Sequence, residues 1–498
     1  MHNVKILLYD GEKNLKAEKG TLLLDLLAQN EILIASSCGG KGTCGKCKVE
    51  IIQDDLNNAT KEVVLSCKYQ ITSNITVKVN NLQSQGIIQS YSIDFETQNQ
   101  KGLGIALDLG TTTLAAYLID LETQKEIKTV SQMNKQAIYG SDVISRIEAS
   151  SNGHLKNLQR ITCNQINIII SSLLGESKER VSKILVSGNT TMLHLLLGVD
   201  PSPMGFAPFK PHFLSIKRLK GRDIGINCED IILMPSTSAF IGSDIVSGII
   251  SCDLINKKGV SLFIDIGTNG EIVLCDNGRL SACSTAAGPA FEGANIEMGM
   301  GAVPNAIDHI KLENGKLNYS TISGQAYGIC GSGLIDLIAI LIDSGIVDEN
   351  GTFTQNNQSA LSDYLRQDKF YITENVYITQ NDIRQFQLAK SALCSGIITL
   401  LKENNLQAKT VDRVYLAGGF GFYLNKENAI KIGILPSELS NVKSIGNSSG
   451  QGAKMCLAND KYLQKGQKVA KSIKIVDLTV NKTFVDNFID NMSFIISN

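Results

Sequence analysis

The sequence predicts a small α+β domain of the β-grasp type, followed by a larger α/β part with two similar lobes. Three observations predict this fold class. A loop rich in cysteine and glycine, residues 36–51, lies among short strand patterns. A polar stretch without periodicity follows at residues 80–102. Beyond it, two apolar strand patterns each end in Asp-x-Gly-Thr, at Asp108 and at Asp265.

The first domain is predicted from short strand and helix patterns. Residues 3–10, 47–53 and 74–80 have the composition and alternation of strands. Residues 21–30, TLLLDLLAQN, carry an apolar stripe with helical spacing. Strands around a single helix make a β-grasp plan, which we assign to residues 1–82.

Four cysteines of this domain are candidate metal ligands. Cys38, Cys44 and Cys47 form a C-x5-C-x2-C run, and Cys67 follows after a short gap. Disulfides are disfavoured because the N-terminal residues lack a secretory signal pattern, which predicts a reducing, cytoplasmic location. Zinc sites usually pair two short knuckles, whereas three of these cysteines share one glycine-rich loop. The layout favours an iron–sulfur cluster, with zinc as the alternative.

This segment resembles the 2Fe-2S ferredoxins, and its cysteine run is similar to the adrenodoxin type. It departs from that pattern in the short gap before Cys67. The resemblance implies one 2Fe-2S cluster, bound by Cys38, Cys44, Cys47 and Cys67. A shortened loop at this point would leave one edge of the cluster more exposed.

Composition limits what the rest of the chain can do. Residues 83–102 are rich in Gln, Ser and Asn and are interpreted as a linker. The 498 residues are 43% hydrophobic and 19% charged, which is enough for two large lobes, 103–257 and 258–498. The net charge is −1 and no long basic run occurs, so nucleic acid is a poor partner. No apolar stretch is long enough to predict a membrane span.

Each lobe carries a glycine turn suited to phosphate. In DLGTTT, Gly110 lets the hairpin bend, and backbone N–H groups and threonine hydroxyls become donors for phosphate oxygens. DIGTNGEI repeats the pattern after Asp265. Asp108 and Asp265 are candidates to hold Mg²⁺ through its waters. Either turn alone fits a structural turn, but two copies in matched contexts favour a nucleotide site.

These residues carry a second resemblance. DLGTTT, DIGTNGEI and LAGGFG are similar to the phosphate-1, phosphate-2 and adenosine motifs of the superfamily of actin, acetate and sugar kinases and heat-shock chaperones. With the longer motifs at 186–211, 284–300 and 328–339, behind a 2Fe-2S domain, they resemble the ATP-dependent reductive activators of corrinoid proteins. The implied fold is a β-grasp 2Fe-2S ferredoxin domain followed by an actin-like α/β ATPase with two duplicated lobes.

The resemblance assigns roles position by position. Asp108 and Asp265 are expected to act in catalysis with Mg²⁺, and Glu271 to orient the attacking water, unless it points to solvent. The expected nucleotide-binding residues are Gly110, Thr111, Thr112, Thr113, Gly267, Thr268, Asn269, Gly270, Gly418, Gly419 and Gly421. Gly331, Ser332 and Gly333 begin a helix whose free N–H groups suit an anion, with a plain helix start as the alternative.

Two histidines and one glycine-rich segment are interpreted from the residues around them. His194 and His309 lie in apolar contexts and are interpreted as core histidines rather than cobalt ligands. The segment 288–302, GPAFEGANIEMGMGA, places several glycines and Glu292 in an apolar run. Such a segment is costly to order unless a ligand or a partner uses it, so it is predicted to be a functional loop.

The resemblance implies that the chain returns a corrinoid cofactor from Co(II) to Co(I), with one electron from the 2Fe-2S cluster and with ATP hydrolysis. The implied partners are a corrinoid protein of a methyltransferase system and an upstream electron donor, and a homodimer is left open. A ferredoxin-tethered small-molecule kinase is the main alternative. An actin-like filament would not explain the cluster, and activators of radical dehydratases resemble a layout in which the cluster bridges two subunits.

Overall fold

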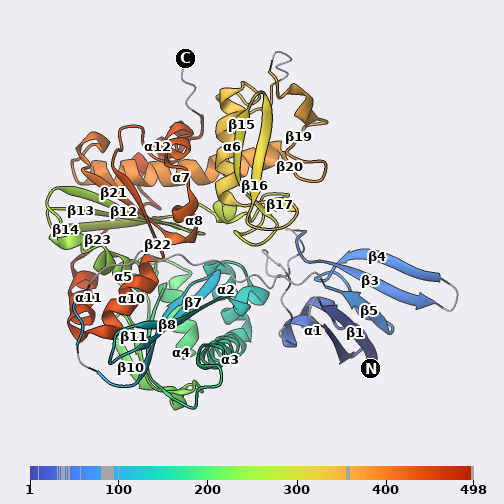
Figure 1. Cartoon of the computed structure of the whole chain (residues 1–498), viewed down its shortest axis with the longest axis horizontal. Coiled ribbons are helices and arrows are strands. Elements are labelled where there is room, and N and C mark those ends of the chain that lie inside the picture. The colour runs from blue at the N-terminus through green and yellow to red at the C-terminus, as the bar shows by residue number, and fades with distance from the viewer. Residues whose placement is uncertain are drawn as a thin grey trace.

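The protein is described by a computed structural model, which covers residues 1–8, 11–30, 32, 34, 40, 42, 45–55, 58–79, 95–98, 100–354 and 359–494. Figure 1 shows two α/β lobes, one above the other, and a small β domain to one side of them. The small domain is formed by the N-terminal part of the chain.

The small domain has the predicted β-grasp plan. Its five-stranded sheet has the order β2-β1-β5-β3-β4. The elements are β1 (His2–Leu8), β2 (Gly11–Ala17), α1 (Leu23–Gln29), β3 (Lys48–Asp55), β4 (Asn58–Leu65) and β5 (Ile75–Lys78). The helix buries Leu23 and Leu27 against Val4, Ile6 and Val77 of the sheet. The patterns predicted β1, β3, β5 and α1, whereas β2 and β4 were not predicted.

The first large lobe is built on a six-stranded sheet of order β10-β11-β9-β6-β7-β8. Its strands are β6 (Leu103–Leu109), β7 (Thr113–Asp120), β8 (Glu126–Met133), β9 (Val181–Gly188), β10 (Lys217–Lys220) and β11 (Cys228–Leu233). Its helices are α2 (Val143–Ala149), α3 (Leu155–Leu174), α4 (Thr190–Leu197) and α5 (Ser243–Ser251). Ile105 and Leu107 of β6 share a core with α3 and α4, whereas Ala106 belongs to the core on the opposite face.

Five strands of the second lobe repeat this topology, while its sixth strand lies at the opposite edge of the sheet. Its sheet has the order β22-β21-β12-β13-β14-β23. The strands are β12 (Val260–Ile266), β13 (Gly270–Asp276), β14 (Arg279–Thr285), β21 (Arg413–Ala417), β22 (Val442–Gly446) and β23 (Lys474–Ile475). β12, like β6, has an antiparallel hairpin partner on one side and a parallel strand on the other. The predicted duplication is therefore present in the strand order itself.

Three helices form a layer between the sheets of the two lobes. α5 packs on α10 (Ser448–Ala458), and α11 (Asp460–Ser472) lies beside them (Figure 1). A Cβ on Gly452 would lie 2.1 Å from the carbonyl oxygen of Ser247, so this glycine permits the close helix approach. α10 contacts β6 and β9, which places this late segment of the chain against the first lobe.

Additional elements extend the second lobe. They are β15 (Ala306–Glu313), β16 (Lys316–Thr321), β17 (Gly328–Ile329), α6 (Gly331–Asp343), β18 (Leu365–Arg366), β19 (Lys369–Tyr371), β20 (Tyr377–Thr379), α7 (Gln380–Glu403), α8 (Gly418–Tyr423), α9 (Lys426–Lys431) and α12 (Lys482–Asp490). α7 packs Ile383, Phe386 and Ile397 in the core that also contains Leu262 and Ile264 of β12. Among the helices that the structure describes, none has the length and apolar character needed to cross a membrane.

The described end of the predicted linker is attached to α10 and α11. The Gln98 amide donates to the carbonyl oxygen of Ala458 at 3.0 Å, and the Gln100 side chain donates to the same oxygen at 3.0 Å. The ring of Phe95 packs edge-on against Tyr462, with the ring centroids 6.4 Å apart. Residues 95–98 and 100–102 therefore run along the ATPase lobes. Residues 83–94 and 99 of the predicted linker lie outside the described residues.

Candidate functional site

The two predicted phosphate turns follow equivalent strands of the two lobes. Asp108 is the second-last residue of β6, and Asp265 is the second-last residue of β12. Each strand runs through a short turn into its antiparallel partner, β7 or β13. Gly110 is needed in the first turn, because a Cβ there would lie 2.5 Å from the carbonyl oxygen of Thr113. Each lobe thus supplies one aspartate and one glycine turn.

The first turn is held by side chains of its own lobe. Asn134 Nδ2 donates to the carbonyl oxygen of Gly110 at 2.8 Å, and Asn189 Nδ2 donates to Thr111 Oγ1 at 2.7 Å. Arg146 is fully buried and donates through Nη2 to the carbonyl oxygen of Thr111 at 2.7 Å. Three separate segments of the first lobe therefore support the shape of this turn.

The second turn depends on Glu292. Within the turn, the Gly267 amide donates to the carbonyl oxygen of Asn269 at 3.0 Å. Thr268 Oγ1 donates to one carboxylate oxygen of Glu292 at 2.6 Å. Thr112, in the turn of the other lobe, donates to the two oxygens of the same carboxylate at 3.4 and 3.5 Å. The carboxylate of Glu292 therefore joins the two turns, as expected of a residue in a functional loop.

Asp108, Asp244 and Asp265 lie near these turns, and desolvation is the largest cause that raises the pKa of each. Desolvation raises the pKa of Asp108 to about 6, while hydrogen bonds from Ser449 and Asn447 act to lower it. Ser449 Oγ donates to Asp108 Oδ1 at 2.7 Å. Desolvation followed by the charges of Asp244 and Asp108 raises the pKa of Asp265 to about 8. A site with this concentration of negative charge favours a cation.

Asp244 is a member of this group that the sequence patterns did not predict. Desolvation, with a smaller contribution from the charge of Asp108, raises its pKa to about 7. It is the second residue of α5, and its Oδ1 accepts a hydrogen bond from the Ile245 amide at 2.9 Å. An Asp at a helix start ordinarily only caps the helix, so the sequence signal was weak.

Glu271 lies on the same face of the sheet as Asp265. The two residues are directly opposite in the antiparallel pair β12–β13, which puts their side chains on one face. Desolvation, then the charges of Asp244 and Asp265, raises the pKa of Glu271 well above its usual value. Ser284 Oγ donates to its carboxylate at 3.4 Å. Glu271 is therefore partly buried beside Asp265, and its role in orienting water stays a prediction.

The predicted adenosine turn is adjacent to Asp265. It joins β21 to α8, and β21 pairs in parallel with β12 so that Ala417 is in register with Asp265. A Cβ on Gly418 would lie 2.7 Å from Asp265 Oδ1, whereas one on Gly419 would have no atom within 4 Å. Gly421 is buried. The open space at Gly419 is compatible with a ligand above this turn.

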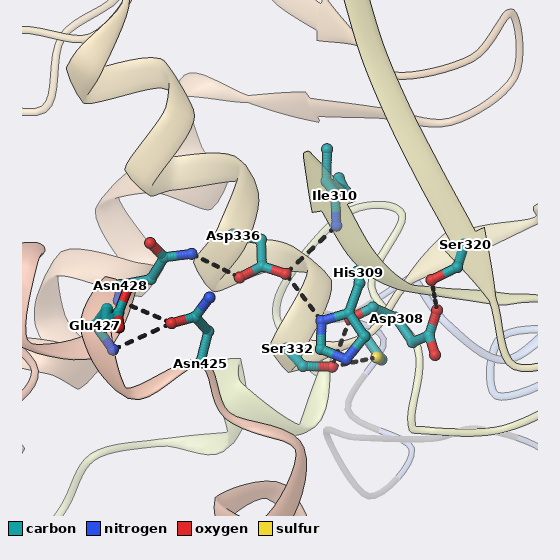
Figure 2. A network of polar contacts seen from close by, with 10 residues as sticks. Asp308, His309, Ile310, Ser320, Ser332, Asp336, Asn425, Glu427 and Asn428 are labelled. Atoms are coloured by element: carbon teal, nitrogen blue, oxygen red, sulfur yellow. Dashed lines mark hydrogen bonds and ion pairs between the residues drawn. The ribbon is translucent and has the colours of Figure 1, made fainter. Parts of the chain in front are cut away.

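The start of α6 is tightly packed by protein groups. Gly331, Ser332 and Gly333 are all buried, and a Cβ on Gly333 would lie 2.6 Å from the carbonyl oxygen of Ile307. Ser332 Oγ donates to the carbonyl oxygen of Asp308 at 2.8 Å (Figure 2). These contacts favour a plain helix start over an anion site at Gly331–Gly333.

The two histidines have different surroundings. His194 is fully buried, its Nδ1 bonds the Thr190 carbonyl oxygen at 2.7 Å, and its Nε2 accepts from the His212 amide at 3.2 Å. It is a core histidine, as predicted. His309 is half-exposed and joins Asp336 of α6 through Nδ1 at 3.0 Å, which raises its pKa (Figure 2). Its setting is therefore a surface network and not the predicted core.

The cluster-binding cysteines are described in part. Cys38 and Cys44 lie outside the described residues. Cys47 and Cys67 are buried with their sulfur atoms 3.3 Å apart, one just before β3 and the other just after β4. The hydroxyl of Ser66, beside Cys67, is buried without a hydrogen-bond partner. Two thiols this close, with a polar group beside them, fit two ligands of one iron–sulfur cluster.

Comparisons with known proteins agree with this geometry. The model for the C-terminal ASKHA domain of RACo matches residues 259–498, the RACo middle region matches 103–257, and the 2Fe-2S cluster binding domain matches 8–72. The chain belongs to the reductive activators of corrinoid proteins. The 2Fe-2S cluster, ATP and Mg²⁺ are accordingly its cofactors, and the predicted ferredoxin and actin-like folds are confirmed.

Relatives span nearly the same length. The corrinoid activation enzyme RamQ of Eubacterium limosum is 28% identical over 97% of this chain and 98% of its own. The Co(II) methylated amine-specific corrinoid protein reductase of Methanosarcina barkeri is 27% identical over 78% of this chain and 77% of its own. A solved structure of a reductive activator for corrinoid,iron-sulfur protein is 29% identical, covers 99% of this chain and 98% of its own, and has a TM-score of 0.74.

Proposed function

We propose that this activator reduces the Co(II) corrinoid of a partner protein in a methyltransferase system to Co(I), with ATP hydrolysis. The observation that carries the proposal is the joining, in one chain, of a ferredoxin domain to a two-lobed cleft with paired phosphate turns. The cluster supplies one electron, which an upstream donor replaces. The kinase alternative leaves the ferredoxin domain unexplained.

We assign the nucleotide to the cleft between the turns. The backbone amides of residues 110–113 and 267–270 would bind the phosphates, and Gly418, Gly419 and Gly421 would lie under the adenosine. Asp108 and Asp265 would hold Mg²⁺ through its waters, because magnesium gives up its water ligands reluctantly.

The attacking water needs an acceptor near the phosphates. Glu271 and Asp244 both have raised pKa values and belong to the same group of carboxylates as Asp265. A base with a pKa near 7 suits proton transfer at neutral pH. Asp244, at the start of α5, interacts electrostatically with both Asp108 and Asp265, so we add it to Glu271 as a second candidate for this acceptor.

ATP is needed because the electron moves uphill. The reduction potential of ferredoxin-type clusters is about −400 mV. Moving one electron to an acceptor whose potential is 100 mV lower costs about 2.3 kcal/mol. Nucleotide binding that changes the angle between the lobes can change the affinity for the partner. A partner held in a geometry that removes an axial ligand from Co(II) becomes easier to reduce.

Partner-stimulated hydrolysis tests the proposal. ATP turnover is measured alone, with a Co(II) corrinoid protein, and with small-molecule acceptors, while phosphorylated products are assayed. We expect the corrinoid protein to stimulate turnover and no phosphorylated acceptor to form. A Cys44→Ser variant is expected to lose the cluster spectrum and electron transfer but to keep the stimulation. A stoichiometric phosphorylated product would instead favour the kinase.

A further inference from the structure

The ferredoxin domain contacts the second lobe through a lysine next to a predicted cluster ligand. Lys46 Nζ donates to the carbonyl oxygen of Ile296 at 2.7 Å and to that of Glu297 at 3.2 Å. Lys46 directly precedes Cys47, and both acceptors belong to the predicted functional loop. An ammonium group that donates to two carbonyl oxygens makes charge-assisted hydrogen bonds, the stronger kind.

The same loop reaches the ATP cleft at its other end. We call residues 288–300 the cleft loop. Its Glu292 accepts hydrogen bonds from Thr268 of the second lobe and from Thr112 of the first. One short segment therefore contacts both phosphate turns and also the ferredoxin domain.

The cleft loop is folded tightly on itself. A Cβ on Gly293 would lie 2.2 Å from the carbonyl oxygen of Met300, and one on Gly299 would lie 2.1 Å from that of Gly293. The Gly299 amide donates to the carbonyl oxygen of Ile296 at 3.0 Å, and the side chain of Ile296 is fully buried. Backbone packed this closely transmits a displacement at one end of residues 293–299 instead of absorbing it locally.

The loop is also attached to the lobe near the lysine contact. The Glu297 amide donates to Asp382 Oδ1 at 2.7 Å, and Tyr377 donates through its hydroxyl to Glu297 Oε1 at 2.5 Å. Asp382 belongs to the first turn of α7 and is buried. This attachment is a fixed point about which displacement of Glu292 would reorient the carbonyl groups that bind Lys46.

We propose that the cleft loop is a docking site for the chain's own ferredoxin domain and that nucleotide phosphates loosen it. Phosphate oxygens entering between the turns compete with Glu292 for the hydroxyls of Thr112 and Thr268 and repel its carboxylate. The loop then moves, and Lys46 loses its acceptors. This inference rests on the proposed position of ATP between the turns. By linkage, a docked ferredoxin weakens nucleotide binding by the same factor.

The test uses the full chain with its cluster and the non-hydrolysed analogue AMPPNP with Mg²⁺. The radius of gyration is measured by small-angle X-ray scattering, and affinity by calorimetry. We expect AMPPNP to expand the parent protein. Lys46→Ala is expected to be expanded without nucleotide and to bind AMPPNP about fivefold more tightly or better. Lys48→Ala, which changes an exposed lysine two residues away, is the matched control and is expected to behave as the parent.

A second variant tests the other end of the loop. Glu292→Gln keeps hydrogen-bonding capacity but removes the charge that phosphate repels, so the expansion on AMPPNP binding is expected to shrink while Lys46 docking persists. AMPPNP binding that leaves the scattering of the parent unchanged, with Lys46→Ala equal to Lys48→Ala, would overturn this inference alone. A parent protein that bound no AMPPNP would overturn the nucleotide assignment and this inference together.

Discussion

The two phosphate turns share a sequence pattern and a place in their sheets but differ in what holds them. The first turn is bonded to Asn134, Asn189 and Arg146, all from its own lobe. The turn of the second lobe is bonded through Thr268 to Glu292, in a loop that also contacts the opposite lobe. The first turn is thus held mainly within its own lobe, whereas the second depends on a loop that touches both lobes.

The aspartates beside the two turns also differ, because their surroundings raise their pKa values by different amounts. Ser449 and Asn447 donate to Asp108 and partly offset the effect of desolvation, leaving its pKa at about 6. Asp265 lacks a comparable stabilising cause and meets the charges of Asp244, Asp108 and Glu292, so its pKa rises to about 8. A bound Mg²⁺ is therefore expected to stabilise the ionised carboxylate of Asp265 in the second lobe more than that of Asp108 in the first.

The largest expected effect comes from removing the support of the first turn. Arg146→Met leaves the carbonyl oxygens of Thr111 and Gly140 without their buried donor, so we expect the free energy of unfolding to fall by about 3 kcal/mol. Glu292→Gln, at the second turn, is expected to change it by less than about 0.5 kcal/mol. Urea unfolding of both variants measures this. Equal losses would mean that the turns do not differ as described.

Next in size is the loss of catalysis when either aspartate is neutralised. Asp108→Asn and Asp265→Asn remove a charge that would hold Mg²⁺, so we expect ATP hydrolysis to fall at least about tenfold, or roughly 1.4 kcal/mol in the transition state. Asp276→Asn, at the far end of β13, is the control and should hydrolyse ATP at the parent rate. Parent rates in both cleft variants would make these carboxylates structural.

A smaller effect is expected from Asn189. Asn189→Ser keeps a side chain able to cap α4 but removes the donor to Thr111 Oγ1. Losing one neutral hydrogen bond should lower the free energy of unfolding by about 1 kcal/mol, and ATP binding should weaken by up to about fivefold because the Thr111 hydroxyl is no longer oriented. Calorimetric titration checks this. An unchanged affinity would show that the first turn does not need this support.

The smallest effect is a pH dependence that separates the two aspartates. Their folded pKa values lie above the unfolded value of about 3.9, so the stability they contribute is present below about pH 4 and lost as the pH rises through the folded values. Without Mg²⁺ and nucleotide, Asp108→Asn should flatten the stability curve between about pH 4 and 6 and, because its charge contributes to the raised pKa of Asp265, make the curve less steep up to about pH 8. Asp265→Asn should flatten it up to about pH 8. Variant curves parallel to the parent curve over both windows would contradict these shifts.

Local sequence was enough to predict β1, β3, β5, β6 and β12, and the turns with Asp108 and Asp265 that end the last two. Each rests on a contiguous pattern, such as an apolar strand followed by Asp-x-Gly-Thr. Glu292 was singled out because its glycine-rich loop is costly to order unless a ligand or a partner binds it. Such patterns are visible in a single sequence because strands and tight turns require these residue types at these positions.

The supporting residues could not be predicted in this way. Ser449 meets Asp108 across 341 positions of the chain, and Asn189 meets Thr111 across 78. Both contacts depend on how the helices pack, including the return of α10 to the first lobe. The sequence around Asp244 also looks like an ordinary helix start, which gives no sign of a site residue. Pairing over such distances leaves no periodic trace in a single sequence.

The central claim is that ATP in this cleft drives an electron from the ferredoxin domain to a corrinoid protein. The most direct measurement mixes the reduced protein with Co(II) corrinoid protein, with and without Mg-ATP, and follows the Co(I) absorption band. We predict that Co(I) appears with Mg-ATP, and that it is greatly reduced without ATP or with the Asp265→Asn variant. Co(I) formation at the same rate and extent in all three samples would contradict the account.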